Sequence, residues 1–443
     1  MSVAVLAGGE GHRQLALRSL VVFGARIVGA GLTLLSTLLL ARQLGAEAFG
    51  LVFAVWAPVL LLAQVSTLNL PALATPEIAT ALARGNVAEA ERFIRFSRRV
   101  LCLATPVAAA AAGLFLWLSH PDPLAEAPGL LLLALVSLPL LAVQQTHVAQ
   151  AVALGRAAEV QVPNELLRPV LIVAGLLLLG AAGVRIGPTV AVALMAGALA
   201  LTLAVQIALT QGSFVARVWG DPGRAGGWLA SAFALAPSRL LMQQQKALVV
   251  LTASMTLGLA ETGVIALAMS LIGLLGFGIL AAEMTYGPVL ARAWQSADKA
   301  ELERAVAASG LVRCVPVVGA AVMLGLLAGP VVALFGEAFD GAARVVQLLL
   351  VVPVVRAVSG QGRLLLQLGG HRSVLFWVNA VAILALLILP LTPLVPRSAP
   401  GLAVCVGAVL VLVSCAEAAL ARYCCGVDPT VLPSLLRRSR RTA

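Results

Sequence analysis

The sequence predicts an all-α polytopic membrane protein of about twelve transmembrane helices, arranged as two pseudo-symmetric six-helix lobes around a central cavity. The residues are 61% hydrophobic and only 11% charged, whereas charged residues make up about a quarter of soluble domains. Apolar runs of about 20 residues, enough to cross a bilayer, recur along the chain. Such runs must be helical, because lipid offers no water to satisfy an open backbone.

Polar or Pro/Gly-rich turns separate the apolar runs. The first 17 residues lack the basic, apolar and cleavage segments of a signal peptide, so the first run is predicted to remain as a helix. The predicted transmembrane helices are 18–41, 51–70, 96–118, 128–152, 165–184, 188–211, 229–252, 262–286, 309–329, 342–366, 374–394 and 401–423.

Two short motifs recur about 213 residues apart. Leu44-Gly45, followed by Gly50, returns as Leu257-Gly258, followed by Gly263. The charged turn Ala88–Arg92 returns as Ala300–Arg304. Six helices separate the copies, so both copies enter the membrane from the same side, as in transporters built from parallel repeats.

The repeat predicts an N-terminal lobe at residues 1–215 and a C-terminal lobe at residues 216–443, each with six transmembrane helices. The second lobe also carries a basic tail at its end. The net charge of +11 reflects 30 basic residues. With the N-terminus inside, most of them fall on the cytoplasmic side, which predicts that both termini are cytoplasmic. The external side holds only Arg42, Arg185, Arg344 and Arg397. Nucleic acid is not a predicted partner, since no basic patch with interleaved aromatic residues is present.

After the basic residues near helix ends are assigned to the two aqueous sides, five remain within the predicted helices, where ionisable groups are costly and are candidates for function. Arg239 and Lys246 are seven residues apart, as are Arg356 and Arg363. This spacing places each pair on one helical face. Together with Arg26, these residues predict a cationic cavity between the lobes for an anionic, phosphate-linked substrate. The open alternative is that several of them extend to the lipid headgroups.

Neutral amides accompany the basic residues. Gln144, Gln145 and Gln243 are candidate ligands for sugar hydroxyls, with hydrogen bonding between helices as the alternative. Glu283 is a candidate for ion coupling, and a structural ion pair with a basic neighbour is its alternative. Further polar residues in or near the helices are Gln64, Asn69, His147, Gln150, Gln244, Gln245, Glu261, Gln347, Gln361, Gln367 and Glu417.

The sequence contains no Gly-rich phosphate loop before a helix, no clustered metal ligands and no nucleophile elbow. It therefore predicts no enzymatic activity, no cofactor and no metal site. A membrane-embedded transferase with a diffuse site is the enzymatic alternative. The six cysteines are interpreted as small buried apolar residues, and lipidation is the alternative for Cys424-Cys425.

The first hundred residues resemble a known family. Leu40–Gly45, followed by Phe49-Gly50, stands between two apolar runs, and Gly85-Asn86, followed by Ala90-Glu91-Arg92, forms a charged turn. The stretch Arg26–Ala57 resembles the opening of the Wzx-type polysaccharide flippases. That superfamily also includes the lipid II flippases and the multidrug and toxin extrusion (MATE) antiporters.

The resemblance implies a MATE-like fold in a multi-pass protein of the bacterial inner membrane. Its expected cargo is an undecaprenyl-diphosphate-linked oligosaccharide, moved by alternating access for O-antigen (lipopolysaccharide), capsule or exopolysaccharide assembly. Expected partners are this lipid-linked glycan, membrane lipids and a polysaccharide polymerase. The alternatives are an ion-coupled MATE-type exporter of drugs or metabolites and a lipid II flippase. About twelve helices are fewer than lipid II flippases have, and the first four lack the acidic residue typical of MATE antiporters.

Overall fold

The computed structural model describes residues 9–210, 225–296 and 298–431, and every regular element in these ranges is a helix. Nine helices there are long and apolar enough to cross a membrane, or ten if one bent pair counts as a single span. The prediction of an all-α polytopic membrane fold is confirmed. Each of the twelve predicted segments falls on a helix or on a series of shorter helices. The predicted lobe boundary at residues 215 and 216 and the basic C-terminal tail lie outside the described residues.

The chain divides into two compact units. Unit 1 comprises Met1–Leu44 and Leu51–Ala236, and unit 2 comprises Gly45–Gly50 and Pro237–Ala443. A short stretch of the first helix, which carries one copy of the repeated motif, therefore groups with the C-terminal half of the chain.

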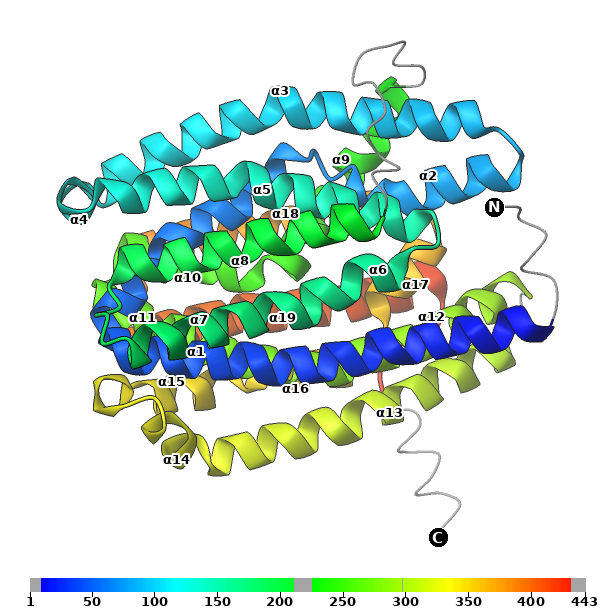
Figure 1. Ribbon diagram of the computed structural model, residues 1–443. Coiled ribbons are helices and arrows are strands. Elements are labelled where there is room, and N and C mark those ends of the chain that lie inside the picture. Colours follow the sequence, from blue (N-terminus) through cyan, green and yellow to red (C-terminus); the bar gives the residue numbers. More distant parts are fainter. Residues whose placement is uncertain (1–8, 211–224, 297, 432–443) are drawn as a thin grey trace, which may run out of the picture. The chain divides into compact units, whose positions relative to one another are not determined.

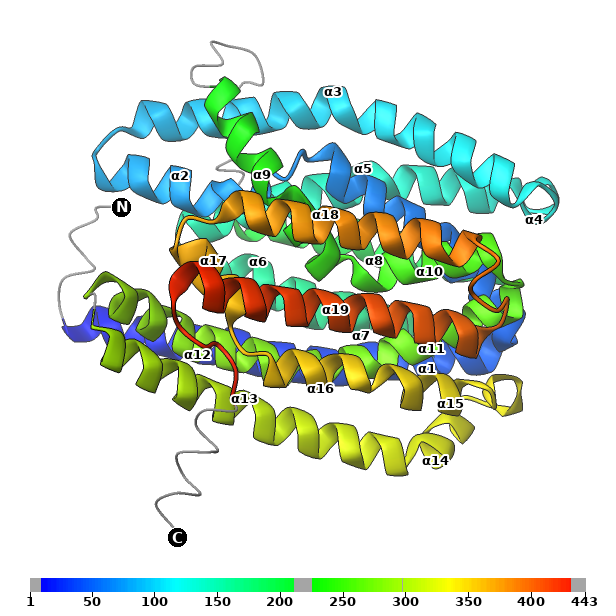
Figure 2. The ribbon, with the colours of Figure 1, turned by 180° about the vertical axis from the view of Figure 1, so that it is seen from behind.

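Unit 1 is a bundle in which α3 lies beside α2 and α5, and α8 packs on α5 and α7 (Figures 1 and 2). Aromatic side chains join α3 to the start of α9, where the rings of Phe93 and Trp228 meet edge to face with centroids 5.2 Å apart. Its elements are most of α1 (Gly9–Ser66), then α2 (Pro71–Ala83), α3 (Val87–Ser119), α4 (Pro121–Glu126), α5 (Pro128–Ala153), α6 (Ala157–Val162), the π-helical turn η2 (Pro163–Leu167), α7 (Arg168–Ala181), α8 (Pro188–Leu209) and the first part of α9 (Ala225–Gln243).

Helix α1 contains two predicted transmembrane segments, which is one reason why fewer than twelve helices in the described ranges satisfy the criterion for a span. Only Gly45 departs from helical geometry, with φ 72° and ψ 174°. Glycine suits this position because it lacks the Cβ that penalises positive φ. The stretch Leu44–Gly50, which lies between the first two predicted transmembrane segments, is therefore helical apart from a kink at Gly45.

Unit 2 is organised around α19, which packs against α15, α16, α17 and α18, while α12 pairs with α13 (Figure 2). Its elements are the end of α9, then α10 (Gln245–Thr256), α11 (Leu259–Gly273), α12 (Gly276–Gln295), α13 (Lys299–Leu326), α14 (Ala328–Ala333), the 3-10 turn η3 (Glu337–Phe339), α15 (Ala342–Leu349), α16 (Val351–Val358), α17 (Gly362–Leu368), α18 (Arg372–Ile388), the 3-10 turn η4 (Leu389–Leu391) and α19 (Ala399–Cys425).

The charged turns of the repeat have the same local structure in both copies. The side chain of Asn86 caps α3 by accepting a hydrogen bond from the backbone N–H of Glu89. About 212 residues later, Asp298 caps α13 by accepting from the N–H groups of Ala300 and Glu301. Both caps satisfy backbone donors that a helix leaves unpaired at its start.

The two copies of the glycine motif contact each other within unit 2, and the contacts are reciprocal. The Cα of Gly50 lies against the carbonyl of Leu259, and the Cα of Gly263 lies against the carbonyl of Ala46. A side chain at either glycine would overlap that backbone. Small residues four positions apart allow such close helix crossings in membrane proteins.

Candidate functional site

Unit 2 contains a partly open cavity beside the gap between α16 and α17, and the roughly 410 Å³ of space between its lining atoms includes open solvent. A neighbouring cavity of about 370 Å³ shares four of its lining residues: Arg356, Arg363, Ser414 and Glu417. Charged groups in the first cavity come from α12, α13, α16, α17 and α19, namely Glu283, Arg313, Arg356, Arg363 and Glu417.

Two glycines create the gap between the helices. Gly360 has φ 84°, and its Cα lies against the carbonyl of Pro429, so a side chain is excluded for two reasons. Gly362 begins α17 directly against α19, where an added Cβ would lie 2.6 Å from the carbonyl oxygen of Glu417. The helix series bends by 43° here. The break therefore exposes Gln361 and Arg363 to the cavity.

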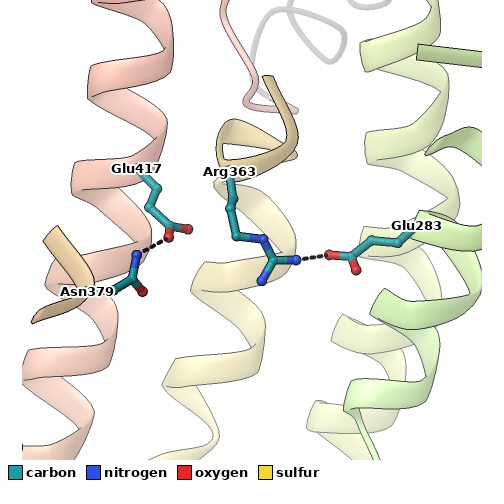
Figure 3. Close-up of polar contacts among 4 residues, drawn as sticks. All are labelled: Glu283, Arg363, Asn379 and Glu417. Carbon is teal, nitrogen blue, oxygen red and sulfur yellow. Dashed lines mark hydrogen bonds and ion pairs between the residues drawn. The ribbon is translucent and has the colours of Figure 1, made fainter. Parts of the chain in front are cut away.

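The carboxylates of the cavity have different partners (Figure 3). The Arg363 guanidinium donates to Glu283, with Nη2 3.1 Å from Oε1. The carboxylate of Glu417 instead accepts from the side chain of Asn379, at 3.3 Å from Nδ2. Arg363 thus lies between two acids of different helices and is bonded to one of them (Figure 3).

The other polar groups of the cavity have donors without partners in the described part of the chain. Arg313 is 2% exposed; its Nε donates to the carbonyl of Ala357 at 3.2 Å, and its Nη2 is buried without a hydrogen bond. Gln361 is 4% exposed, and neither its amide nitrogen nor its amide oxygen is bonded. Arg356 forms no hydrogen bond or ion pair with any described residue.

Unpartnered buried donors are costly, and a buried charge without a partner costs more. The cavity combines three guanidinium groups with two carboxylates, and one guanidinium is already paired with a carboxylate. The remaining excess of positive charge and of N–H donors suits an anionic ligand with several acceptor oxygens.

Three of the residues selected from the sequence meet in this cavity: Arg356, Arg363 and Glu283. The argument that placed the two arginines on one helical face is wrong, because the helix between them is broken at residues 359–361. They meet instead because α16 and α17 both border the cavity.

The pair Arg239 and Lys246 is also separated by a helix break, at Gln244. Lys246 donates to Ser270 Oγ at 2.7 Å, whereas Arg239 and Gln243 are exposed on α9. None of these three selected residues lines either cavity described above. Their role in substrate binding stays a prediction.

Two of the three selected residues of unit 1, Arg26 and Gln144, have structural partners there. Arg26 Nε lies 3.5 Å from Glu165 Oε1 in the π-helical turn. Gln144 Nε2 donates to Gln206 Oε1 at 3.3 Å, in a buried contact between α5 and α8, and Gln145 is half-buried. The Gln144 contact matches the alternative of hydrogen bonding between helices, and substrate binding by Arg26, Gln144 and Gln145 stays a prediction.

The sequence analysis did not select Arg313, Gln361, Glu417 or Asn379. The charge count assigned Arg313 to the cytoplasmic side, whereas the structure buries it in α13 against α16. Gln361 and Glu417 were noted only as polar residues in or near helices. The signal that could have identified Gln361 is the Gly-x-Gly around it, which is unfavourable within a continuous helix. Within the described ranges, no group of three or more His, Cys, Asp or Glu side chains is arranged to hold a metal ion.

Comparisons with known proteins place this geometry in a known fold. No family model and no curated protein matches the sequence. An inward-facing structure of a multidrug resistance MATE family transporter of the MOP superfamily matches with a TM-score of 0.68 and 13% identity, over 89% of this chain and 93% of that one. An outward-facing structure of a multidrug resistance MATE family transporter of the MOP superfamily matches with a TM-score of 0.61 and 14% identity, over 92% of this chain and 95% of that one.

A structure of the lipid II flippase MurJ in an inward closed conformation also matches, with a TM-score of 0.60 and 12% identity, over 92% of this chain and 87% of that one. Identities at this level establish the fold alone. The chain is thus a polytopic integral membrane protein with the fold of the MOP-superfamily transporters, which the MATE transporters and the MurJ flippase share.

Proposed function

We propose that this protein is a flippase that moves an undecaprenyl-diphosphate-linked oligosaccharide across the bacterial inner membrane by alternating access, for the assembly of a surface polysaccharide. The fold is one that carries transporters and a lipid flippase. The resemblance of Arg26–Ala57 to Wzx-type flippases supports the polysaccharide branch within that fold.

The observation that carries the proposal is the arginine-rich cavity of unit 2. Arg313, Arg356 and Arg363 line it against only two carboxylates. Arg363 is balanced by Glu283, whereas placing the other two guanidinium groups inside an apolar helical unit is unfavourable unless an anion accompanies them. A diphosphate head group supplies this negative charge, and an apolar polyprenyl tail can remain in the bilayer during transport.

A MATE-type exporter is the second candidate, because the TM-score of 0.68 is with a multidrug transporter. The partly buried contact between Glu417 and Asn379 also offers a carboxylate for ion coupling. Glu283, the acid selected for that role from the sequence, is paired with Arg363. This candidate predicts that a cation gradient drives transport and that Glu417→Gln abolishes it.

The proposal is tested by reconstituting the full chain into liposomes that contain undecaprenyl-diphosphate-linked oligosaccharide labelled on the sugar. The fraction of label accessible to a membrane-impermeant glycan-cleaving enzyme is followed over time. We expect the protein to expose the label of the inner leaflet. Undecaprenol, which lacks the diphosphate, should not compete with the labelled lipid.

Variants connect the transport to the cavity. Arg356→Ala should reduce the transport rate at least about tenfold, as expected for the loss of a charge-assisted contact. The matched control is Arg344→Ala, which removes an exposed arginine of α15 outside both cavities. Equal transport by the protein and by empty liposomes would contradict the proposal. Export of cationic drugs without movement of the lipid-linked glycan would favour the second candidate.

A further inference from the structure

We propose that Arg313, Arg356 and Gln361 form a subsite that binds a phosphoryl group, and that Arg363 is not one of its ligands. The inference rests on the proposed function for the identity of the natural ligand. The subsite itself is argued from the donors that the described residues leave without partners.

The first step is to separate the arginines by their partners. Arg363 is bonded to Glu283 at 3.1 Å, and the two side chains are 18% and 31% exposed. Recruiting Arg363 to a phosphate would leave the Glu283 carboxylate beside a second anion, which is unfavourable in a poorly solvated site. Arg363 therefore serves as a counter-charge for Glu283.

The second step concerns the direction of the remaining donors. The bond from Arg313 Nε to the carbonyl of Ala357 fixes that guanidinium beside the residue that follows Arg356 in the chain. The Nε–H of Arg313 is occupied by this bond. The Nη2 of the same guanidinium remains buried without a hydrogen-bond partner in the described structure. Arg356 and Arg313 both line the first cavity, so two guanidinium groups with available N–H donors border one space.

The third step is the contribution of Gln361. Its amide is buried, lines the same cavity and has no hydrogen-bond partner among the described residues. A buried amide without partners is rare, and one at a cavity indicates a missing ligand or solvent. Its position is determined by Gly360 and Gly362, each of which lies against a backbone carbonyl. The amide N–H is therefore held in place for an acceptor.

The ligand chemistry follows from these donors. Arginine presents parallel N–H groups that match two oxygens of a phosphoryl group, and the amide adds a neutral donor for a third. A carboxylate also accepts several hydrogen bonds, but its two oxygens lie in one plane, whereas the oxygens of a phosphoryl group are arranged tetrahedrally and can face donors that converge from different helices. The phosphoryl group can belong to a lipid diphosphate or to a free phosphate or pyrophosphate in the cytoplasm.

The test is binding to the full chain in nanodiscs of neutral lipid, measured by calorimetry with three probes: undecaprenyl diphosphate, inorganic pyrophosphate and inorganic phosphate. Arg356→Gln and Arg313→Gln should each weaken binding at least about tenfold, and Gln361→Leu about threefold to tenfold, as expected for lost hydrogen bonds to an anion. Arg356→Lys should bind the probes more tightly than Arg356→Gln but more weakly than the unmodified protein, because lysine restores the positive charge without the parallel N–H groups of arginine.

The decisive control is the double variant Glu283→Gln/Arg363→Gln, which removes the neutral ion pair without changing the net charge. It should bind the probe within about threefold of the unmodified protein. Arg313 is buried, so its variant is interpreted only where elution and thermal unfolding match the unmodified protein; Arg356→Gln and Gln361→Leu test the subsite independently.

Binding of undecaprenyl diphosphate that pyrophosphate displaces would assign the subsite to the lipid head group. Binding of pyrophosphate or phosphate alone would assign the same subsite to a soluble anion. Binding of none of the three probes would overturn the inference, as would a loss in the double variant that equals the loss in Arg356→Gln. Transport of the lipid-linked glycan with unchanged binding in all three variants would overturn the subsite and leave the proposed function intact. Binding of a probe that the three variants weaken, without transport of the lipid-linked glycan, would overturn the proposed function and leave the subsite intact.

Discussion

At the scale of single residues, the partner of a side chain decides its role more than its chemical type does. Arg356 and Arg363 are the same residue type, on neighbouring helices of one unit, and both line the two cavities. Only Arg363 has a carboxylate partner, Glu283. One arginine is therefore available to a ligand, and the other maintains the charge balance of the cavity.

The Arg363–Glu283 pair should contribute to stability. Glu283→Gln leaves the guanidinium without its counter-charge, so we expect a loss of about 1–3 kcal/mol. The double variant Glu283→Gln/Arg363→Gln should lose less than the single variant, because no unpaired charge remains. Thermal unfolding of the purified protein in detergent, analysed as a double-mutant cycle, measures the coupling. Glu337→Gln, at an exposed position of η3, is the control. A double variant that is less stable than both Glu283→Gln and Arg363→Gln would contradict this account.

The sequence could predict the arginines but not their partners. Burial of ionisable groups follows from the apolar runs, and this was sufficient to select Arg356, Arg363 and Glu283. Arg313 was missed because position relative to a span end was the only available criterion. It lies near the start of the predicted helix 309–329, whereas α13 begins at Lys299 and places Arg313 well inside the helix. The partner of Glu283 is 80 residues away along the chain, and no periodicity within one helix indicates it.

At the scale of elements, the cavity depends on the break between α16 and α17. The segment that follows α19 holds this break from outside the helix. The backbone N–H of Val431 donates to the carbonyl of Val358 at 3.2 Å, and the carbonyl of Pro429 lies against Gly360. Asp428 shapes the segment by accepting from Thr430, both from its backbone N–H at 2.9 Å and from its hydroxyl at 2.7 Å.

Substitution of Gly360 should therefore cost more than its backbone angle alone requires. Gly370→Ala provides the comparison, because Gly370 has φ 77° and open space around it, whereas Gly360 has φ 84° and the Pro429 carbonyl beside it. Positive φ costs alanine about 1–2 kcal/mol, and the overlap at Gly360 adds about 1–3 kcal/mol. Midpoints of thermal unfolding should decrease in the order unmodified protein, Gly370→Ala, Gly360→Ala. Equal midpoints for the two variants would show that the segment after α19 does not hold the break.

Alanine substitutions at two glycines of α1 should change the stability of the protein in opposite directions, because only one of these glycines lies against another helix. Gly31 has open space around it, so Gly31→Ala should stabilise the protein by up to about 1 kcal/mol through helix propensity. Gly50→Ala places a methyl group on the Leu259 carbonyl and should destabilise by about 1–3 kcal/mol. Thermal unfolding of both variants checks the sign. A stabilising Gly50→Ala would refute the contact between the two copies of the motif.

Local signals in the sequence identified which elements exist but not where they break. The apolar runs located every predicted span on a helix or a helix series. The breaks at Gln244 and at Ser359–Gln361 lie inside those runs, where composition changes little. They depend on tertiary contacts, such as that between Gly360 and Pro429, which lie far apart in the sequence.

At the scale of the whole molecule, the prediction of the fold depended mainly on two patterns in the sequence, the hydropathy and the internal repeat. Hydropathy determined the class, because a chain this apolar must satisfy its backbone within helices in lipid. The internal repeat predicted two lobes, and its two copies show matching helix caps at Asn86 and Asp298. The substrate cannot be derived in this way, because a fold hosts many cargoes and the cargo is determined by the side chains of the site.

The sequence predicts the orientation of the chain in the membrane, and the fold shows which connections can be used to test it. Within unit 1, the α2–α3 turn lies at one end of the bundle and the α7–α8 turn at the other (Figures 1 and 2). The unit 2 connections also alternate, with the α12–α13 turn and the η4–α19 connection at opposite ends (Figures 1 and 2). In both units the turn that opens with a capped helix, at Asn86 or Asp298, is adjacent to the basic residues that are predicted to be cytoplasmic.

Labelling of single cysteines in a cysteine-free variant of the full chain tests this orientation without changing the charges that determine it. The chosen positions are Val87 and Ala300 beside the capped turns, and Val184 and Leu394 at the opposite ends; all four are exposed. Val184→Cys and Leu394→Cys should react with a membrane-impermeant maleimide in intact spheroplasts. Val87→Cys and Ala300→Cys should react only after permeabilisation. The reverse pattern would place both termini outside, and a pattern that differs between the units would show that the two repeats do not enter the membrane from the same side.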